Sequence, residues 1–233
     1  MISVDTVYQK VLALANKEQR GYITPQEFNL LADKAQMELY DMYFHDIKTA
    51  VHKATNQQGV AFDEIELIQE KLQPFQANTV LTLGANLGLL TIPDDVYYIN
   101  ILQDANGGRE VVEMTLKETS YTENHPLLSA TTSRKTYVRE PNSQIRIHPL
   151  LTEETTFDLR YYKRPTPPNW AYVVVQKRAL YNSNSSVDFT LHASEEELLV
   201  ARILQLAGIV IMKPGIVEIG SAEISAKKVQ QNN

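Results

Sequence analysis

The sequence predicts an α+β fold, in which N-terminal helices and a C-terminal helix form a helical body. A small antiparallel β meander or sandwich is inserted between them. Apolar residues recur with helical spacing over about residues 3–72 and again after residue 194. Between about residues 79 and 163 the apolar period falls to two, which is typical of strands with one buried face. We therefore expect one composite domain with a helical part at 1–75, a β part at 76–193 and a helical part at 194–233.

The N-terminal part contains helix starts that can be recognised residue by residue. Ser3 can cap a first helix, which should end within residues 16–21. The run Thr24-Pro25-Gln26-Glu27 combines an N-cap, a proline in the first turn and a capping box. It opens a long helix that reaches at least Lys48. A third, shorter helix is expected over residues 62–72, because a proline lies just beyond it.

The clearest strand pattern lies between Lys135 and Pro165, where apolar and polar residues alternate in three short runs. Ile145 and Ile147 point to one side of their run, and Phe157, Leu159 and Tyr161 share a face of the next. Short turns separate the runs, so we expect an antiparallel meander. Upstream, we expect strands at 80–83 and 89–92, and a hairpin that joins 96–103 to 109–115 through the turn residues 104–108.

The C-terminal part centres on a helix that is apolar on every side. Prolines at 165, 167 and 168 exclude a ladder strand there, while residues 170–176 are expected to form a strand and 187–191 a short strand or extended link. A capping box over Ser194–Glu197 starts the apolar helix, which must be buried in a core or against another subunit. The interface candidates are the apolar residues of this helix and of the amphipathic segment 214–229, namely Leu198, Ile203, Leu206, Val210, Ile224 and Val229.

Composition and charge restrict the function. The chain has 233 residues, no cysteine, 43 % hydrophobic residues and a net charge of −6. It begins without the features of a signal peptide, and its longest apolar stretch, 198–212, is interrupted by Arg202 and Gln205, so we expect no membrane association. Residues 1–75 carry 11 acidic and 7 basic side chains, whereas 134–164 carry 4 and 7. This balance argues against tight non-specific DNA binding but suits a surface that DNA passes.

Three motifs could suggest a ligand site, and each has a simpler structural explanation. Residues 16–27 resemble an EF-hand loop, but Arg20 stands where calcium needs an oxygen ligand. His45 and His52 are seven residues apart without further well-placed ligands. The turn 84–88 lacks the lysine and the helix of a phosphate-binding loop. With no G-x-S-x-G elbow, no H-E-x-x-H motif and no cysteine nucleophile, we expect no metal, no cofactor and no enzymatic activity.

The order of these segments resembles the adaptor ring proteins, also called tail tubular protein A, that join portal to tail in short-tailed bacteriophages. The resemblance rests on Leu90–Asp95 opening a hairpin, on Tyr137-Val138 ahead of Ile145–Pro149, on Leu159–Pro165 and on the Glu-rich C-terminal helix. The runs 16–29 and 194–206 are similar to virion structural proteins of crAss-like phages. Residues 121–133 have no counterpart in the shorter adaptors.

The resemblance implies a non-enzymatic structural protein of a phage virion. It implies a ring of about twelve copies in the head-to-tail connector, with the genome passing through the lumen. The partners would be further copies of this chain, the portal protein and neighbouring tail or ring proteins. Assembly would occur in the host bacterial cytoplasm. Residues 224–233 are the candidate docking tail for the portal.

Two other classes of function are open at this point. A carbohydrate- or receptor-binding β module of a phage tail would present Tyr161, Tyr162 and Trp170 to its ligand, because aromatic rings stack on sugars. A cell-envelope hydrolase is the third class, since a catalytic site can be assembled from residues far apart in the sequence.

Overall fold

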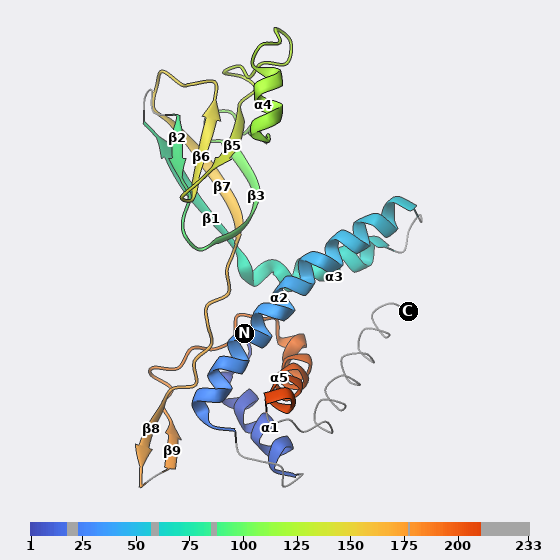
Figure 1. Ribbon diagram of the computed structural model, residues 1–233, viewed down its shortest axis with the longest axis vertical. Coiled ribbons are helices and arrows are strands. Elements are labelled where there is room, and N and C mark those ends of the chain that lie inside the picture. The colour runs from blue at the N-terminus through green and yellow to red at the C-terminus, as the bar shows by residue number, and fades with distance from the viewer. Residues whose placement is uncertain (18–22, 57–60, 85–87, 177, 211–233) are drawn as a thin grey trace. The chain divides into compact units, whose positions relative to one another are not determined.

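The computed structural model describes residues 1–17, 23–56, 61–84, 88–176 and 178–210, and it confirms the predicted α+β fold. The chain forms two compact units (Figure 1). Unit 1 comprises Met1–Pro74 and the chain from Pro165 onward, and unit 2 is the inserted segment Phe75–Arg164. The β unit therefore ends at Arg164, not near residue 193 as expected, because the stretches around Thr166, Trp170 and Thr190 contact the helical unit.

Unit 1 is built from helices. Helices α1 (Val4–Lys17), α2 (Pro25–Asn56) and α5 (Glu196–Val210) pack together, and α3 (Ala61–Leu72) folds back along α2 (Figure 1). The core takes buried apolar residues from each of the three packed helices, among them Val7, Val11, Phe28, Tyr40, Leu199 and Ile203. This arrangement buries apolar residues of α1, α2 and α5, and burial of that kind is the main source of helix stability in proteins.

The helix starts agree with the sequence at α2 and differ at α5. The Thr24 N–H donates to Glu27 Oε2 over 2.9 Å, and the Glu27 N–H donates to the Thr24 hydroxyl over 3.3 Å, so the predicted capping box is confirmed. The box predicted over Ser194–Glu197 is wrong. A 3₁₀ turn, η2 (Ala193–Glu195), precedes α5, and its N-cap is His192, whose side chain accepts from the Ser194 N–H.

Polar contacts hold both ends of the segment from Pro165 to His192, which precedes η2 and α5, on the rest of unit 1. Ile2 and Phe189 exchange backbone hydrogen bonds of 3.3 and 3.1 Å. The buried Gln36 side chain donates to the Thr166 carbonyl over 2.8 Å and accepts from the Thr190 N–H over 3.1 Å. One buried amide thus fixes both ends of this segment against α2, which explains why the segment belongs to unit 1.

Unit 2 contains two sheets that share one core. After the 3₁₀ turn η1 (Gln73–Phe75), the first sheet has the order β1-β7-β3 and the second the order β2-β6-β5-β4. The strands of the first sheet are β1 (Gln76–Leu83), β3 (Val96–Asp104) and β7 (Thr155–Lys163). Those of the second are β2 (Leu89–Thr91), β4 (Val112–Glu113), β5 (Thr136–Glu140) and β6 (Gln144–His148).

The predicted meander is correct for two of its three strands. β5 and β6 form an antiparallel hairpin across the turn 141–143, where Asn142 and Ser143 have positive φ. β7 instead lies in the other sheet, between β1 and β3. The predicted faces are confirmed, because Ile145, Ile147 and the alternate residues of β7 are all buried in the same cluster. Two stacked sheets bury both apolar faces at once, which a single flat meander would not do.

The predicted hairpin of 96–103 with 109–115 is also only partly formed. The turn 104–108 is present, but the only antiparallel pairing described across it is the bridge between Gln103 and Glu110. β4 then leaves to pair in parallel with β5. Helix α4 (Leu116–Thr122) follows, and its capping box joins Thr115 and Glu118.

Candidate assembly interface

The most unusual surface of the described chain is a hairpin of unit 1, made of β8 (Tyr172–Val175) and β9 (Arg178–Tyr181). The register places Tyr172 opposite Tyr181 and Val174 opposite Ala179, which gives one face of the hairpin. Val173 opposite Leu180 and Val175 opposite Arg178 give the other face, called the valine face here. Apart from Arg178 on the valine face, neither face has the charged or strongly polar residues that a solvated strand carries on its outer side.

The hairpin exposes its apolar side chains on both sides. The exposed fraction is 52 % for Val173, 63 % for Val174, 47 % for Val175 and 52 % for Leu180. Such a sequence is typical of strands buried on both faces. A two-stranded hairpin is at best marginally stable in water by itself. The β8–β9 hairpin therefore has the composition of a buried element, although its apolar side chains are exposed to solvent.

The base of the hairpin is fixed to the helices through Trp170. Its ring stacks on Tyr172 and Tyr181, with centroid separations of 5.8 and 5.7 Å. The indole N–H donates to Asp5 Oδ1 over 2.9 Å, and the Trp170 backbone N–H donates to Asn29 Oδ1 over 2.8 Å. These contacts hold the ribbon in one direction before it meets a partner, which lowers the entropy cost of binding.

The charge of the hairpin is of one sign. From Asn169 to Val187 the sequence contains two adjacent basic residues, at positions 177 and 178, and no acidic residue. The described one, Arg178, is exposed and lies on the valine face beside Val175. A surface that covers this face must therefore supply apolar area and should supply negative charge.

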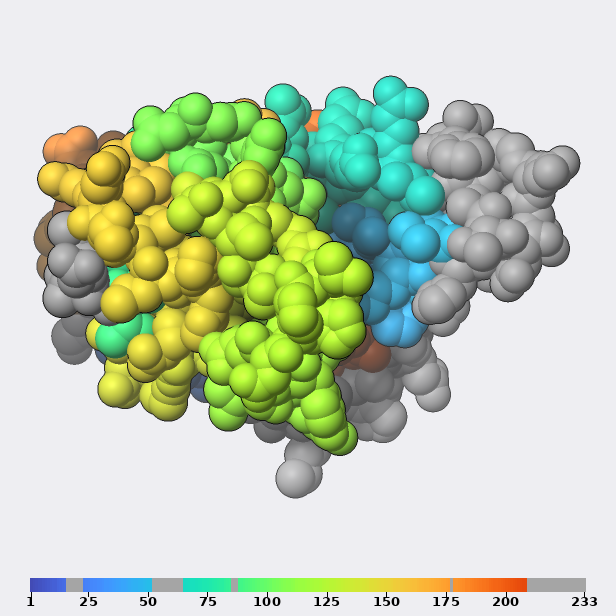
Figure 2. All heavy atoms as spheres, turned by 90° about the horizontal axis from the view of Figure 1, so that it is seen from above, coloured from blue at the N-terminus to red at the C-terminus, as the bar shows by residue number. Residues whose placement is uncertain are grey.

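Unit 2 carries a second group of exposed apolar side chains, on α4 and the loop after it. Leu116, Tyr121 and Leu127 are exposed, the last by 80 %. Arg134 fixes the loop by donating to the Leu127 and Ser129 carbonyls over 3.0 and 2.8 Å. Figure 2 shows the yellow-green atoms of this segment on the outside of unit 2. The stretch 121–133 is thus a structured projection, although its exposed side chains are less densely apolar than those of the hairpin.

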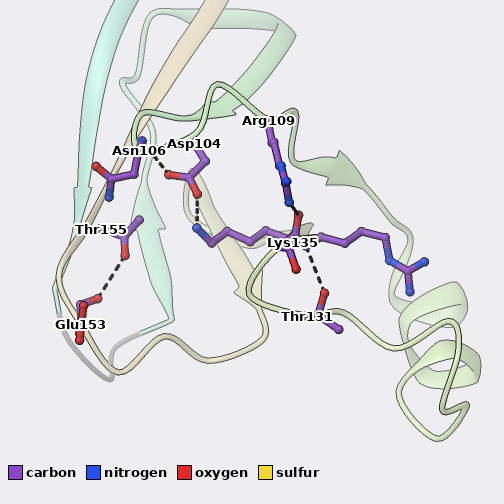
Figure 3. Close-up of polar contacts among 9 residues, drawn as sticks. Asp104, Asn106, Arg109, Thr131, Lys135, Glu153 and Thr155 are labelled. Carbon is purple, nitrogen blue, oxygen red and sulfur yellow. Dashed lines mark hydrogen bonds and ion pairs between the residues drawn. The ribbon is translucent and has the colours of Figure 1, made fainter.

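Unit 2 contains a buried ion pair that lies within a small network of polar contacts (Figure 3). Lys135 Nζ donates to Asp104 Oδ2, with side-chain exposures of 10 and 14 %, and it lies 5.6 Å from the centre of the Phe157 ring. Asp104 Oδ1 also accepts from the Asn106 N–H over 3.1 Å. Arg109 donates to the Ser133 carbonyl nearby. Each charge has its partner, so the cluster joins the 104–108 turn to the segment before β5.

Unit 1 has its own buried ion pair. Lys71 Nζ lies 3.0 Å from Glu195 Oε1, and the Glu195 side chain is only 1 % exposed. The pair links the end of α3 to the turn before α5. The Tyr43 hydroxyl is buried nearby without a hydrogen-bond partner among the described residues. Burial, followed by the charges of Glu195 and Asp46, raises the pKa of Tyr43 above its usual range.

The structure places the predicted interface residues inside unit 1 or outside the described chain. Leu198, Ile203 and Leu206 are buried in the core, so they offer no free surface to a neighbouring subunit. Val210 ends α5, and its side chain is not described; Ile224 and Val229 lie outside the described residues, as does the proposed tail 224–233. The helix is apolar on all sides because its own chain surrounds it. The alternative that the sequence left open, a core helix, is the one that the three described residues support.

The residues predicted for carbohydrate binding are not available to a ligand. Tyr161, Tyr162 and Trp170 are all buried. Tyr161 donates its hydroxyl proton to Asp95 at the end of the sheet, and Trp170 supports the hairpin as described above. No sugar can stack on these rings without unfolding their surroundings.

Among the described residues, no group of three or more histidine or carboxylate side chains is placed to hold a metal ion. The EF-hand-like segment 16–27 lies partly outside the described chain. Within the described ranges, no helix combines the length and the apolar character that a membrane crossing requires.

Sequence reasoning found one strand of the hairpin and missed its partner. Residues 170–176 were expected to form a strand, but β9 is only four residues long and follows directly after the polar pair at 176–177. The signal that was available is the near-mirror order Tyr-Val-Val-Val and Arg-Ala-Leu-Tyr on either side of that pair. No protein-family model matches the sequence, and no curated protein is significantly similar to it.

Proposed function

We propose that this chain is a non-enzymatic structural subunit of a phage virion that assembles into an adaptor ring between portal and tail. The observation that carries the proposal is the β8–β9 hairpin, which is apolar on both faces, exposed on both faces and braced at its base. A subunit whose apolar ribbon is covered only on assembly is expected to expose it as a monomer. The resemblance to adaptor ring proteins supplies the kind of assembly.

The energetics favour burial of the hairpin by a partner. Full burial of a valine or leucine side chain stabilises a protein by roughly 1.5–3 kcal/mol. Covering the exposed halves of Val173, Val174, Val175 and Leu180 would therefore contribute about 1 kcal/mol each. Together the four side chains would contribute about 4 kcal/mol, which is comparable to the contribution of one strong hot-spot residue at a protein interface.

The proposed partners follow from the same assembly. Copies of this chain would form the ring of about twelve, and the portal and neighbouring tail or ring proteins would contact its two ends. The net charge of −6 suits a lumen through which double-stranded DNA passes without being held. The proposed location is the virion, after assembly in the host bacterial cytoplasm.

A triple variant of the valine face tests the proposal. Val173→Thr, Val175→Thr and Leu180→Thr keep β propensity but remove the apolar surface. We expect the parent chain to form closed rings in negative-stain images and mass photometry at high concentration, and the triple variant to remain monomeric with an unchanged circular dichroism spectrum. Val80→Thr is the matched control, because Val80 is an exposed strand valine in unit 2. A parent chain that stays monomeric at every concentration, alone and with portal, would overturn the proposal.

A further inference from the structure

We infer that the valine face of one copy docks on the outward face of α3 in the next copy, which is the contact that closes the ring. The inference rests on the proposed function and deepens it, because it names the two surfaces that meet. The partner that the valine face binds is a second copy of this chain.

The outward face of α3 has the chemistry that the hairpin requires. Leu67 is 50 % exposed, and the side chains of Glu66 and Glu70 beside it are exposed as well. Residues 66, 67 and 70 fall within an arc of about 100° on a helix, so they form one surface. Ile65 and Ile68 are partly buried and Leu72 is buried, which shows that the opposite side of α3 packs on the body of unit 1.

The negative charge of this face is not neutralised within α3. The sequence of α3 contains a single basic residue, Lys71, and its ammonium group is paired with the buried Glu195 carboxylate. Among the described residues no ion pair involves Glu66 or Glu70 either, so both carboxylates can pair with a cation from another copy. Arg178 and the adjoining tip of an acid-free hairpin supply that cation, and Val173, Val175 and Leu180 supply the apolar surface for Leu67.

The two surfaces cannot meet within one copy. The base of the hairpin is fixed at Asn29, near the start of the 32-residue helix α2, whereas α3 folds back from the other end of that helix (Figure 1). A helix of that length spans about 48 Å, of which α3 can cover the last 18 Å or so. A four-residue strand reaches only about 13 Å. Figure 2 shows the teal atoms of α3 at the surface of the molecule.

A contact between two different surfaces of identical subunits is head-to-tail. Such a contact propagates from copy to copy, and it ends either in an open filament or in a closed ring. The geometry of one hairpin against one helix therefore gives the symmetry class that an adaptor ring needs, without any isologous pairing of hairpins. Two hairpins that met tip to tip would instead bring their cations together.

Disulfide trapping tests the contact directly, since the chain has no cysteine of its own. We expect a mixture of the Val175→Cys chain and the Leu67→Cys chain to give a covalent dimer under mild oxidation. The double variant Val175→Cys/Leu67→Cys should give a ladder of higher multimers. Val174→Cys, on the opposite face of the hairpin, is the matched control and should cross-link at least tenfold less to Leu67→Cys.

Charge reversal gives an independent readout. Arg178→Glu and the pair Glu66→Arg/Glu70→Arg should each lower the assembled fraction at least tenfold at low salt, and the combination should restore it. If rings form but neither cross-linking nor charge reversal affects them as stated, the inference is wrong and the proposed function stands. If the triple valine-face variant abolishes assembly while all α3 variants assemble normally, the hairpin docks elsewhere. If the parent chain never assembles, both proposals fail together.

Discussion

At the scale of single residues, the Lys71–Glu195 pair is the most consequential charge interaction of unit 1. Removing one partner of a buried pair leaves the other charge without compensation, which costs more than the pair itself contributes. We predict that Glu195→Gln lowers the free energy of unfolding by about 3 kcal/mol in urea titrations. The double variant Lys71→Met/Glu195→Gln should recover part of this loss. Lys10→Gln is the control, because its ion pair with Glu196 is largely solvated, and it should have little effect.

Tyr43 is a residue whose hydroxyl costs stability. It is buried without a hydrogen-bond partner among the described residues, so we predict that Tyr43→Phe raises the free energy of unfolding by roughly 1 kcal/mol at neutral pH. The control, Tyr121→Phe at an exposed site, should change nothing. A loss of stability in Tyr43→Phe would mean that the hydroxyl has a favourable contact in the folded protein.

The same residue gives a pH dependence with a definite sign. Burial raises the pKa of Tyr43 in the folded state above the ordinary value of 10.0. Titration of Tyr43 therefore leaves the free energy of unfolding unchanged below pH 10. Above pH 10 this free energy falls as the pH rises, since only the unfolded chain releases the proton. At one pH unit above the unfolded pKa this loss is about 1.4 kcal/mol. Tyr43→Phe should lack it, so we predict that the stability gap between variant and parent widens from pH 9 to about pH 11.

At the scale of elements, one buried hydrogen bond helps to hold the base of the β8–β9 hairpin on α1. The indole N–H of Trp170 donates to Asp5, and Asp5→Ala would leave this donor buried and unpaired. We predict a loss of about 1–2 kcal/mol in the stability of unit 1. Trp170 is the single tryptophan, so its fluorescence reports unfolding of this unit. The control Glu153→Ala, an exposed carboxylate of unit 2, should leave the fluorescence transition unchanged.

The elements that the sequence predicted are those specified by local chemistry. The capping box of Thr24 and Glu27 joins residues only three apart, and the alternation at Ile145 and Ile147 identifies a buried face from neighbouring residues alone. The sheet that a strand joins is a long-range choice: β7 lies between β1 and β3 because Leu81 and Leu102 complete its apolar face. No local pattern encodes that choice.

Three of the predicted interface residues, Leu198, Ile203 and Leu206, are buried within unit 1 for a similar reason. An apolar helix such as α5 can be covered by its own chain or by another, and residues far away in the sequence decide which. Helix α5 contacts α1 and α2, and its residues Leu199 and Ile203 are fully buried. The hairpin has a weaker sequence signal, yet its apolar side chains are about half exposed, since the described helices of unit 1 leave them uncovered. Exposure of an apolar surface is a property of the fold and cannot be recovered from composition.

At the scale of the whole molecule, unit 2 has what an independently folding domain needs. Its buried cluster draws every member from residues 81–161, so the core does not depend on unit 1. The ends of the unit are also adjacent, because Gln76 at the start of β1 pairs with Tyr162 near the end of β7. A domain with its own core and adjoining termini is expected to fold after excision and to be replaceable by a short linker in the parent chain.

We therefore predict that residues 75–164 fold alone, with a cooperative urea transition and dispersed amide resonances. We also predict that a chain in which a short Gly/Ser linker replaces these residues still assembles, since the hairpin and α3 both belong to unit 1. Mass photometry of the linker chain measures this directly, and the triple valine-face variant in the same background should abolish assembly. If the linker chain folds, as judged by Trp170 fluorescence, but stays monomeric while the parent chain forms rings, unit 2 supplies an essential ring contact. Contact through the hairpin and α3 would then not be sufficient to close the ring.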